Sequence, residues 1–231
     1  MDARSQILGS IRNALKRGPL GEAAAAGPAG RIAAHAKGLI PARTAALDAQ
    51  GLSALFVRMA EEVQATVTRV AAPADVPGAV ADYLANHNLP ADLIMAPDPA
   101  LDAYPWAERP LLQIRRGRAE DPDPVSVTGA FAAIAETGTL MLISGTDRPT
   151  TLNLMPDTHI VVLRADQVVG PYETAWDRLR AEQSGNAMPR TVNFITGPSR
   201  TGDIEQRIQL GAHGPRRLHI VLVDGPGVTA A

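Results

Sequence analysis

The sequence predicts an α/β protein with a mixed, largely parallel sheet flanked by helices, a partly antiparallel insert and an N-terminal helical arm. From about Gly51 onward, helix-like and strand-like segments alternate, which is typical of a parallel sheet. In the middle of the chain, two apolar runs flank a glycine-containing turn, which indicates an antiparallel pair. We therefore expect residues 1–46 to form an N-terminal helix and linker, and residues 47–231 to form the α/β domain.

The first segment predicts a short helix on a tether. Asp2 can cap a helix with five apolar residues on one face: Ile7, Leu8, Ile11, Ala14 and Leu15. Gly18 and Pro19 end this helix, and the Gly/Ala/Pro-rich stretch 18–30 reads as a linker. Such a helix either folds back on the domain or docks on a partner, and the sequence leaves both possibilities open.

The alternating segments that follow predict two helices and three strands. The helices are expected at residues 52–64 and 76–86, and the strands at 65–71, 93–96 and 111–114. The helical segments have apolar residues at helical spacing, whereas the strand segments are short and rich in apolar residues.

Residues 126–144 predict two strands joined by a tight turn at Gly138. One long helix is the alternative, but Thr137, Gly138 and Thr139 are poor helix formers and residues 140–143 resemble a buried strand. Residues 159–169 repeat this pattern, with a turn near residues 165–166, and are also expected to be antiparallel. A helix with proline at its start is expected at 171–181.

The tail predicts a small βαβ unit. Strands are expected at 191–196 and 218–223, with a helix from Asp203 to about Ala212 between them. Gly211 and Gly214 supply a C-terminal stop for this helix. The connection is long enough for a parallel crossover.

Composition and charge exclude several classes of function. The 231-residue chain has a formal net charge of -2 with arginine and acidic residues interspersed, which argues against a nucleic-acid-binding protein. It has no cysteine, so disulfides and cysteine ligands for iron–sulfur clusters or structural zinc are excluded. The five histidines lack zinc-enzyme spacing, so no metal is expected. No uncharged apolar run approaches the roughly 18 residues of a membrane span. The N-terminus lacks a signal-peptide core, so a cytoplasmic protein is expected.

The loop after residue 196 is the first candidate site. The spacing of Gly197 and Gly202 matches a phosphate-binding P-loop, but Asp203 stands where that loop requires lysine, which excludes such a nucleotide site. Ser199 is not in a hydrolase nucleophile elbow, because Thr201 replaces the second glycine of that motif.

Two interpretations of this loop stay open. A glycine loop that leads into a helix N-terminus favours an anion, and Arg200 can act as its clamp. Alternatively, Asp203 caps the helix with Gln206 reaching back, and the remaining residues only form a turn.

Glu136 is the second candidate. A carboxylate between two apolar runs costs free energy unless it is exposed or hydrogen-bonded, and strand ends often carry catalytic groups. The alternative is an ordinary exposed turn residue. His159 and His213 are each more often capping or hydrogen-bonding residues than catalysts.

Three stretches together resemble the lactate-utilisation (LUD) domain family: GAFAAIAETGTLMLIS, HIVVLRADQVV and FITGPSRTGDIEQRIQLGAHGPRRLHIVLVDG. The resemblance covers most of the chain from about Leu52, and the chain length fits the short, cluster-free members. It implies a fold like that of the ribose-5-phosphate isomerase and CoA-transferase group. It also implies a non-redox role in oxidising L-lactate to pyruvate. No cofactor is expected in this chain, and iron–sulfur clusters are expected only in partner subunits.

The family motifs imply a set of site residues. Glu136 is the candidate catalytic residue. The candidate ligand-binding residues are Thr137, Gly138, Thr139, Thr196, Gly197, Pro198, Ser199, Arg200, Thr201, Gly202, Asp203 and His213. We expect a small carboxylate or phosphate near Arg200, with Glu136 close by. One alternative is a stand-alone CoA-transferase or sugar-phosphate enzyme that uses Glu136 as nucleophile or base. A second is an interaction module whose loops are structural.

Overall fold

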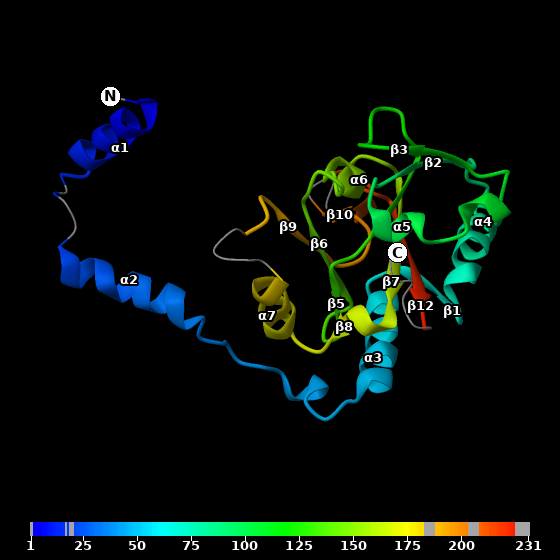
Figure 1. Cartoon of the computed structure of the whole chain (residues 1–231), viewed down its shortest axis with the longest axis horizontal. Helices are drawn as coiled ribbons and strands as arrows, with labels where there is room; N and C mark the ends of the chain where they lie inside the picture. The colour runs from blue at the N-terminus through cyan, green and yellow to red at the C-terminus, as the bar shows by residue number, and fades with distance from the viewer. Residues whose placement is uncertain (1, 17, 19–20, 183–187, 203–207, 225–231) are drawn as a thin grey trace. The chain divides into compact units, whose positions relative to one another are not determined.

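The computed structural model describes residues 2–16, 18, 21–182, 188–202 and 208–224 (Figure 1). The chain divides into two compact units, Met1–Leu39 and Ile40–Ala231. Within the described residues, no helix has the length and apolar character needed to cross a membrane.

The first unit contains two helices. Helix α1 spans Ala3–Ala14, and the Asp2 side chain caps it by accepting a hydrogen bond from the Ser5 backbone N–H at 2.7 Å, as the sequence predicts. Helix α2 spans Glu22–Ala34 and begins inside the stretch expected to be a linker. Alanine has the highest helix propensity, and the alanine-rich run forms a helix despite Pro28.

A six-stranded parallel sheet forms the centre of the second unit. Its strand order is β1-β12-β7-β4-β2-β3, and every neighbouring pair is parallel. The strands are β1 (Thr66–Val70), β12 (Arg217–Val223), β7 (Thr158–Arg164), β4 (Val125–Gly129), β2 (Asp92–Met95) and β3 (Gln113–Arg116). The prediction of a largely parallel sheet is therefore confirmed.

Both faces of this sheet are buried, because successive side chains of the central strands enter different cores. Ile160 and Val162 of β7 pack with helix α4 (Val76–Asn86) in one core. Val161 and Leu163 pack with helix α3 (Ala49–Glu62) in another core. The helices predicted at 52–64 and 76–86 thus form and pack against the sheet.

A second, four-stranded sheet provides the antiparallel part of the fold. Its order is β8-β5-β6-β9, with strands β8 (Val168–Val169), β5 (Ala132–Ile134), β6 (Thr139–Ile143) and β9 (Val192–Ile195). Strand β6 is antiparallel to both β5 and β9. Helix α7 (Tyr172–Glu182) packs on this sheet through Ala175 and Leu179. The hairpin turn predicted at Gly138 is confirmed, with φ of 66° at this glycine.

Residues 159–169 do not form an antiparallel pair, so that prediction is wrong. Strand β7 lies in the large sheet, whereas β8 lies in the small sheet and is parallel to β5. The one-turn helix η4 (Ala165–Gln167) separates them. Its Gln167 side chain accepts a hydrogen bond from the Arg164 N–H and donates one to the Ala130 carbonyl, which fixes the direction of the chain.

The predicted βαβ unit at the tail is also wrong. Strand β9 joins the small sheet and β12 joins the large one. Between them, β10 (Arg200–Thr201) pairs antiparallel with β11 (Gln209–Leu210), so the predicted helix is absent at 208–212. Residues 203–207 of that prediction lie outside the described residues. The Gly211 N–H donates to the Ser199 carbonyl at 2.9 Å, and this hydrogen bond continues the antiparallel pairing.

Helix α3 depends on a side-chain cap that can be tested. The Asp48 Oδ1 accepts the Gly51 N–H at 2.8 Å, so Asp48→Ala should lower the free energy of unfolding by about 1 kcal/mol. Urea titration followed by circular dichroism measures the change. Asp48→Asn, which can still accept this bond, should keep most of the stability. Equal stability of Asp48→Ala and the wild type would contradict the assignment of the cap.

Candidate functional site

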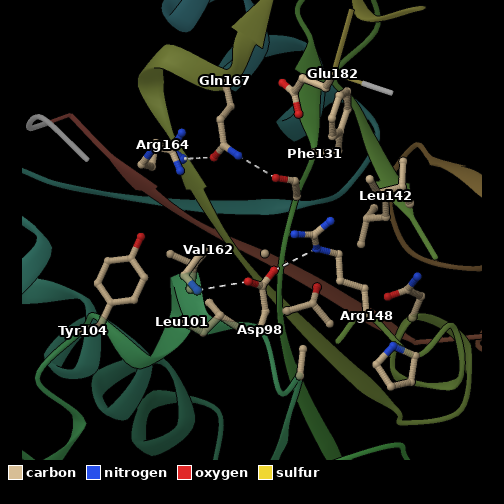
Figure 2. A pocket seen from close by; sticks show the side chains of 18 of the residues that line it. Asp98, Leu101, Tyr104, Phe131, Leu142, Arg148, Val162, Arg164, Gln167 and Glu182 are labelled. Carbon is tan, nitrogen blue, oxygen red and sulfur yellow. Dashed lines mark hydrogen bonds and ion pairs between the residues drawn. The ribbon is translucent and has the colours of Figure 1, made fainter. Parts of the chain in front are cut away.

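A cavity of about 320 Å³ lies at the carboxyl ends of strands β2, β4 and β7, and we call it the strand-end pocket (Figure 2). Its walls come from the segments that follow β2 and β4, from the end of β7, from the end of β6 and the segment after it, which carries Arg148, and from helices α5 (Pro99–Asp102) and α7. Five charged residues line it: Asp98, Arg148, Arg164, Arg178 and Glu182. The pocket therefore combines apolar walls with a concentration of arginine.

Asp98 and Arg148 form an ion pair in this pocket (Figure 2). The Asp98 Oδ2 accepts a hydrogen bond from Arg148 Nε at 2.9 Å, and its Oδ1 accepts the Ala100 N–H at 3.0 Å. Asp98 is 7% exposed, so the carboxylate is held from both sides in a buried position. Burial tends to lower the pKa of Arg148, but the hydrogen bond to Asp98 and the nearby carboxylates outweigh it and raise the pKa. The guanidinium consequently stays charged.

The other two arginines lie on partly exposed walls. Arg164 donates from Nε to Asp166 Oδ1 at 2.9 Å. Arg178 donates from Nε to Glu182 at 3.1 Å, and its guanidinium carbon lies 5.7 Å from the centre of the Phe131 ring. Each of these guanidiniums thus has a carboxylate partner that fixes its orientation.

The structure places Glu136 in the turn between β5 and β6, where it is buried. Its Oε1 accepts the Tyr172 N–H at 3.3 Å, and Arg43 donates to its backbone carbonyl at 3.0 Å. Its Oε2 is buried without a hydrogen-bond partner among the described residues. The interpretation of Glu136 as an exposed turn residue is wrong, since only 7% of the residue is exposed.

A cluster of hydroxyl groups joins this turn to the end of β9. The Thr139 Oγ1 lies 2.7 Å from Oγ1 of Thr137 and 2.7 Å from Oγ1 of Thr196. The Tyr172 hydroxyl lies 3.0 Å from both Thr137 and Thr139. The structure therefore brings together two segments of the predicted site that are far apart in the sequence.

The described part of the 197–203 loop lines a second cavity of about 230 Å³, which we call the loop pocket. Residues Thr196 to Ser199 and His213 contribute to it. The Ser199 N–H donates to the Pro215 carbonyl at 2.8 Å, and the His213 N–H donates to Ser199 Oγ at 3.3 Å. Arg200 is exposed on β10, Thr201 is buried, and Asp203 lies outside the described residues.

His159 also lines the loop pocket and is fully buried. Its Nε2 lies 2.8 Å from Oγ1 of Thr128, while its Nδ1 has no hydrogen-bond partner among the described residues. Burial lowers the pKa of His159 to about 3, so the imidazole is neutral near pH 7. The described lining of this pocket includes no arginine or lysine.

Two glycines hold the predicted site segments against the C-terminal end of α3. At Gly138, where φ is 66°, an added Cβ would collide with the backbone nitrogen of Ala60. At Gly197, where φ is 73°, an added Cβ would collide with the carbonyl oxygen of Val63. Only glycine allows such close backbone approach in this conformation.

The strand-end pocket was missed by sequence reasoning, although a signal was present. Asp98 lies three residues after the end of the apolar strand β2, and ligands in parallel α/β sheets bind beyond the carboxyl ends of strands. Arg148 and Arg178 gave no comparable signal, because they lie far along the chain from Asp98. Together these features define a cysteine-free α/β protein with a charged cavity of ligand size.

Comparison with known proteins assigns the family. A family model described as the LUD domain matches residues 44–223. Lactate utilization protein C of Deinococcus radiodurans is 35% identical over 169 residues, which cover 69% of this chain and 73% of that protein. Lactate utilization protein C of Geobacillus sp. is 33% identical over 102 residues. The chain belongs to the LUD domain family.

The share of each relative that the alignment covers differs among the relatives. The aligned part spans 42% of the Geobacillus protein, and 40% of an uncharacterized Neisseria meningitidis protein that is 38% identical. A crystal structure of a DUF162 family protein from Deinococcus radiodurans has a TM-score of 0.59 and 30% identity, covering 77% of this chain and 99% of that one. The likeness to the solved structure thus includes most of the described fold.

Proposed function

We propose that this chain is a non-redox component of a system that oxidises L-lactate to pyruvate, and that it binds a small carboxylate. The observation that carries the proposal is the LUD domain match over residues 44–223, together with relatives named Lactate utilization protein C. The strand-end pocket supports the carboxylate part of the proposal, because it is small and carries three arginines.

We propose that partner subunits carry out the redox chemistry. Oxidation of lactate to pyruvate removes two electrons and two protons, one hydrogen leaving the carbon that bears the hydroxyl group and one leaving the hydroxyl oxygen. The chain has no cysteine to ligate an iron–sulfur cluster. We therefore propose iron–sulfur partner subunits as the electron acceptor, with this chain contributing ligand binding or assembly.

Deletion of the gene tests this function. The deletion strain should fail to grow on L-lactate as sole carbon source and should grow normally on pyruvate, because pyruvate enters metabolism after the proposed step. Wild-type protein supplied from a plasmid should restore growth. Normal growth of the deletion strain on L-lactate, in a strain with no second copy of the gene, would exclude the proposal.

Affinity purification of the tagged chain from lactate-grown cells tests the proposed partners. The purified material should contain iron and acid-labile sulfide and show the visible absorbance of iron–sulfur clusters. Purification from cells grown on pyruvate under the same promoter controls for adventitious binding. A chain purified alone and without iron from lactate-grown cells would contradict the complex.

The alternative enzyme that uses Glu136 as nucleophile receives less support from the geometry. A nucleophile must reach its substrate, whereas Glu136 is buried and one of its oxygens accepts the Tyr172 N–H. Turnover of an acyl-CoA or a sugar phosphate by the purified chain, abolished by Glu136→Gln, would favour that alternative.

A further inference from the structure

We infer that the strand-end pocket binds a short 2-hydroxy- or 2-oxocarboxylate, with Arg148 holding the carboxylate group and Asp98 positioning Arg148. The choice of ligand within the class of small carboxylates rests on the proposed function. The location of the site rests on the geometry of the pocket alone.

The pocket lies where ligands bind in this class of sheet. It lies where β2, β4 and β7 end side by side, with Thr128 and Val162 on its walls (Figure 2). Ligands of open α/β sheets bind beyond the carboxyl ends of the strands, where backbone and loop side chains converge. A cavity of about 320 Å³ is at the small end of the range for ligand sites, which suits a compact molecule.

Two carboxylates fix the orientation of the Arg148 guanidinium. Asp98 accepts the hydrogen bond from its Nε, and Asp147 lies 3.4 Å from its Nη2. Its Nη1 has no described hydrogen-bond partner, and 43% of the side chain is exposed. A fixed guanidinium with free N–H groups can bind a carboxylate with little further loss of conformational freedom. Asp98 therefore acts as a positioning residue.

The lining of the pocket suits a carboxylate with a short alkyl group. Three of its five charged side chains are arginines, which favours an anion, and its apolar walls favour an alkyl carboxylate over inorganic phosphate. The buried Asn153 side-chain amide supplies a polar group for an oxygen at C2. Leu101, Leu142 and Val162 supply apolar walls for a short alkyl group.

The sequence-predicted anion site provides the competing location. That prediction placed the anion at Arg200, which is exposed on β10. The two locations thus predict opposite results for the binding affinity of variants at Arg148 and Arg200. The variant at each arginine serves as the matched control for the variant at the other.

Calorimetric titration of the full-length chain with L-lactate and with pyruvate tests the inference. At least one of these monoanions should bind. Lactamide, which is the neutral isostere of lactate, should bind at least tenfold more weakly, and so should inorganic phosphate. Arg148→Gln should weaken binding at least tenfold, Asp98→Asn should weaken it severalfold, and Arg200→Gln should leave it unchanged. Thermal unfolding confirms that each variant is folded.

A second variant keeps the test decisive if Arg148→Gln does not fold. Arg148→Lys keeps the charge but loses the planar fork, so binding should fall severalfold. The inference is overturned if a folded Arg148→Gln binds as tightly as the wild type, or if Arg148→Lys does so where Arg148→Gln does not fold. It is also overturned if Arg200→Gln loses binding. Failure of the wild-type chain to bind either monoanion would also overturn it, even where the deletion strain cannot grow on L-lactate. Binding by the chain together with normal growth of the deletion strain would instead exclude the proposed function and leave the site in place.

Discussion

Replacing Gly138 by alanine is expected to lower the free energy of unfolding by about 2–4 kcal/mol. The residue has φ of 66°, which a side chain rarely adopts, and this backbone strain costs about 1 kcal/mol. The new Cβ would also collide with the backbone of Met59 and Ala60 in α3, and overpacking of a tight interior typically costs about 1–3 kcal/mol. Urea unfolding followed by circular dichroism measures the difference.

Gly117 and Gly202 provide matched controls for this prediction. Gly117 has φ of 143°, but an added Cβ would have no atom of the described residues within 4 Å, so Gly117→Ala measures backbone strain without a collision. At Gly202 an added Cβ likewise meets no described atom within 4 Å, and Gly202→Ala should have a small effect. If Gly138→Ala is as stable as Gly117→Ala, the contact with α3 does not constrain the turn.

Acid is expected to destabilise the protein strongly through two buried histidines. Burial lowers the pKa of His159 to about 3, and burial with the nearby His87 lowers the pKa of His219 to about 4. Both start from an ordinary value of 6.5, so below pH 6.5 the unfolded chain takes up protons that the folded protein does not. Stability should therefore fall as the pH drops from 6.5 towards 4, by roughly 1 kcal/mol per pH unit for each histidine.

Urea unfolding at several pH values between 7 and 4 tests this expectation. His159→Gln removes one titrating group, so the slope of stability against pH should fall by about half, even if the variant is less stable at pH 7. An unchanged slope in both His159→Gln and His219→Gln would show that these side chains do not remain neutral in the folded protein.

Local sequence signals predicted the individual elements of this fold well. Helix α4 occupies the predicted residues, Val76–Asn86, because its apolar face and its flanking turn residues are local features. The hairpin of β5 and β6 was recognised because Gly138 interrupts two apolar runs. Strand pairing was less predictable, since β7 and β8 follow each other in sequence but lie in different sheets. Hydrophobic periodicity does not specify the partner of a strand.

The candidate site was only partly predictable for the same reason. Thr139 and Thr196, which come from two motifs of the family resemblance, share a hydrogen bond. The ion pair of Asp98 and Arg148 joins residues 50 positions apart, and neither lies in a recognisable motif. Such a pair follows from the order of strands in the sheet, which the sequence does not display locally.

The end of helix α3 supports two segments at once, because Gly138 and Gly197 both rest on its backbone. These two segments are therefore expected to open as one cooperative unit rather than as independent loops. Their amide protons should exchange with solvent through a shared opening that requires displacement of the helix end. The positions of Glu136 and Ser199 are thus tied to the stability of a helix that neither residue belongs to.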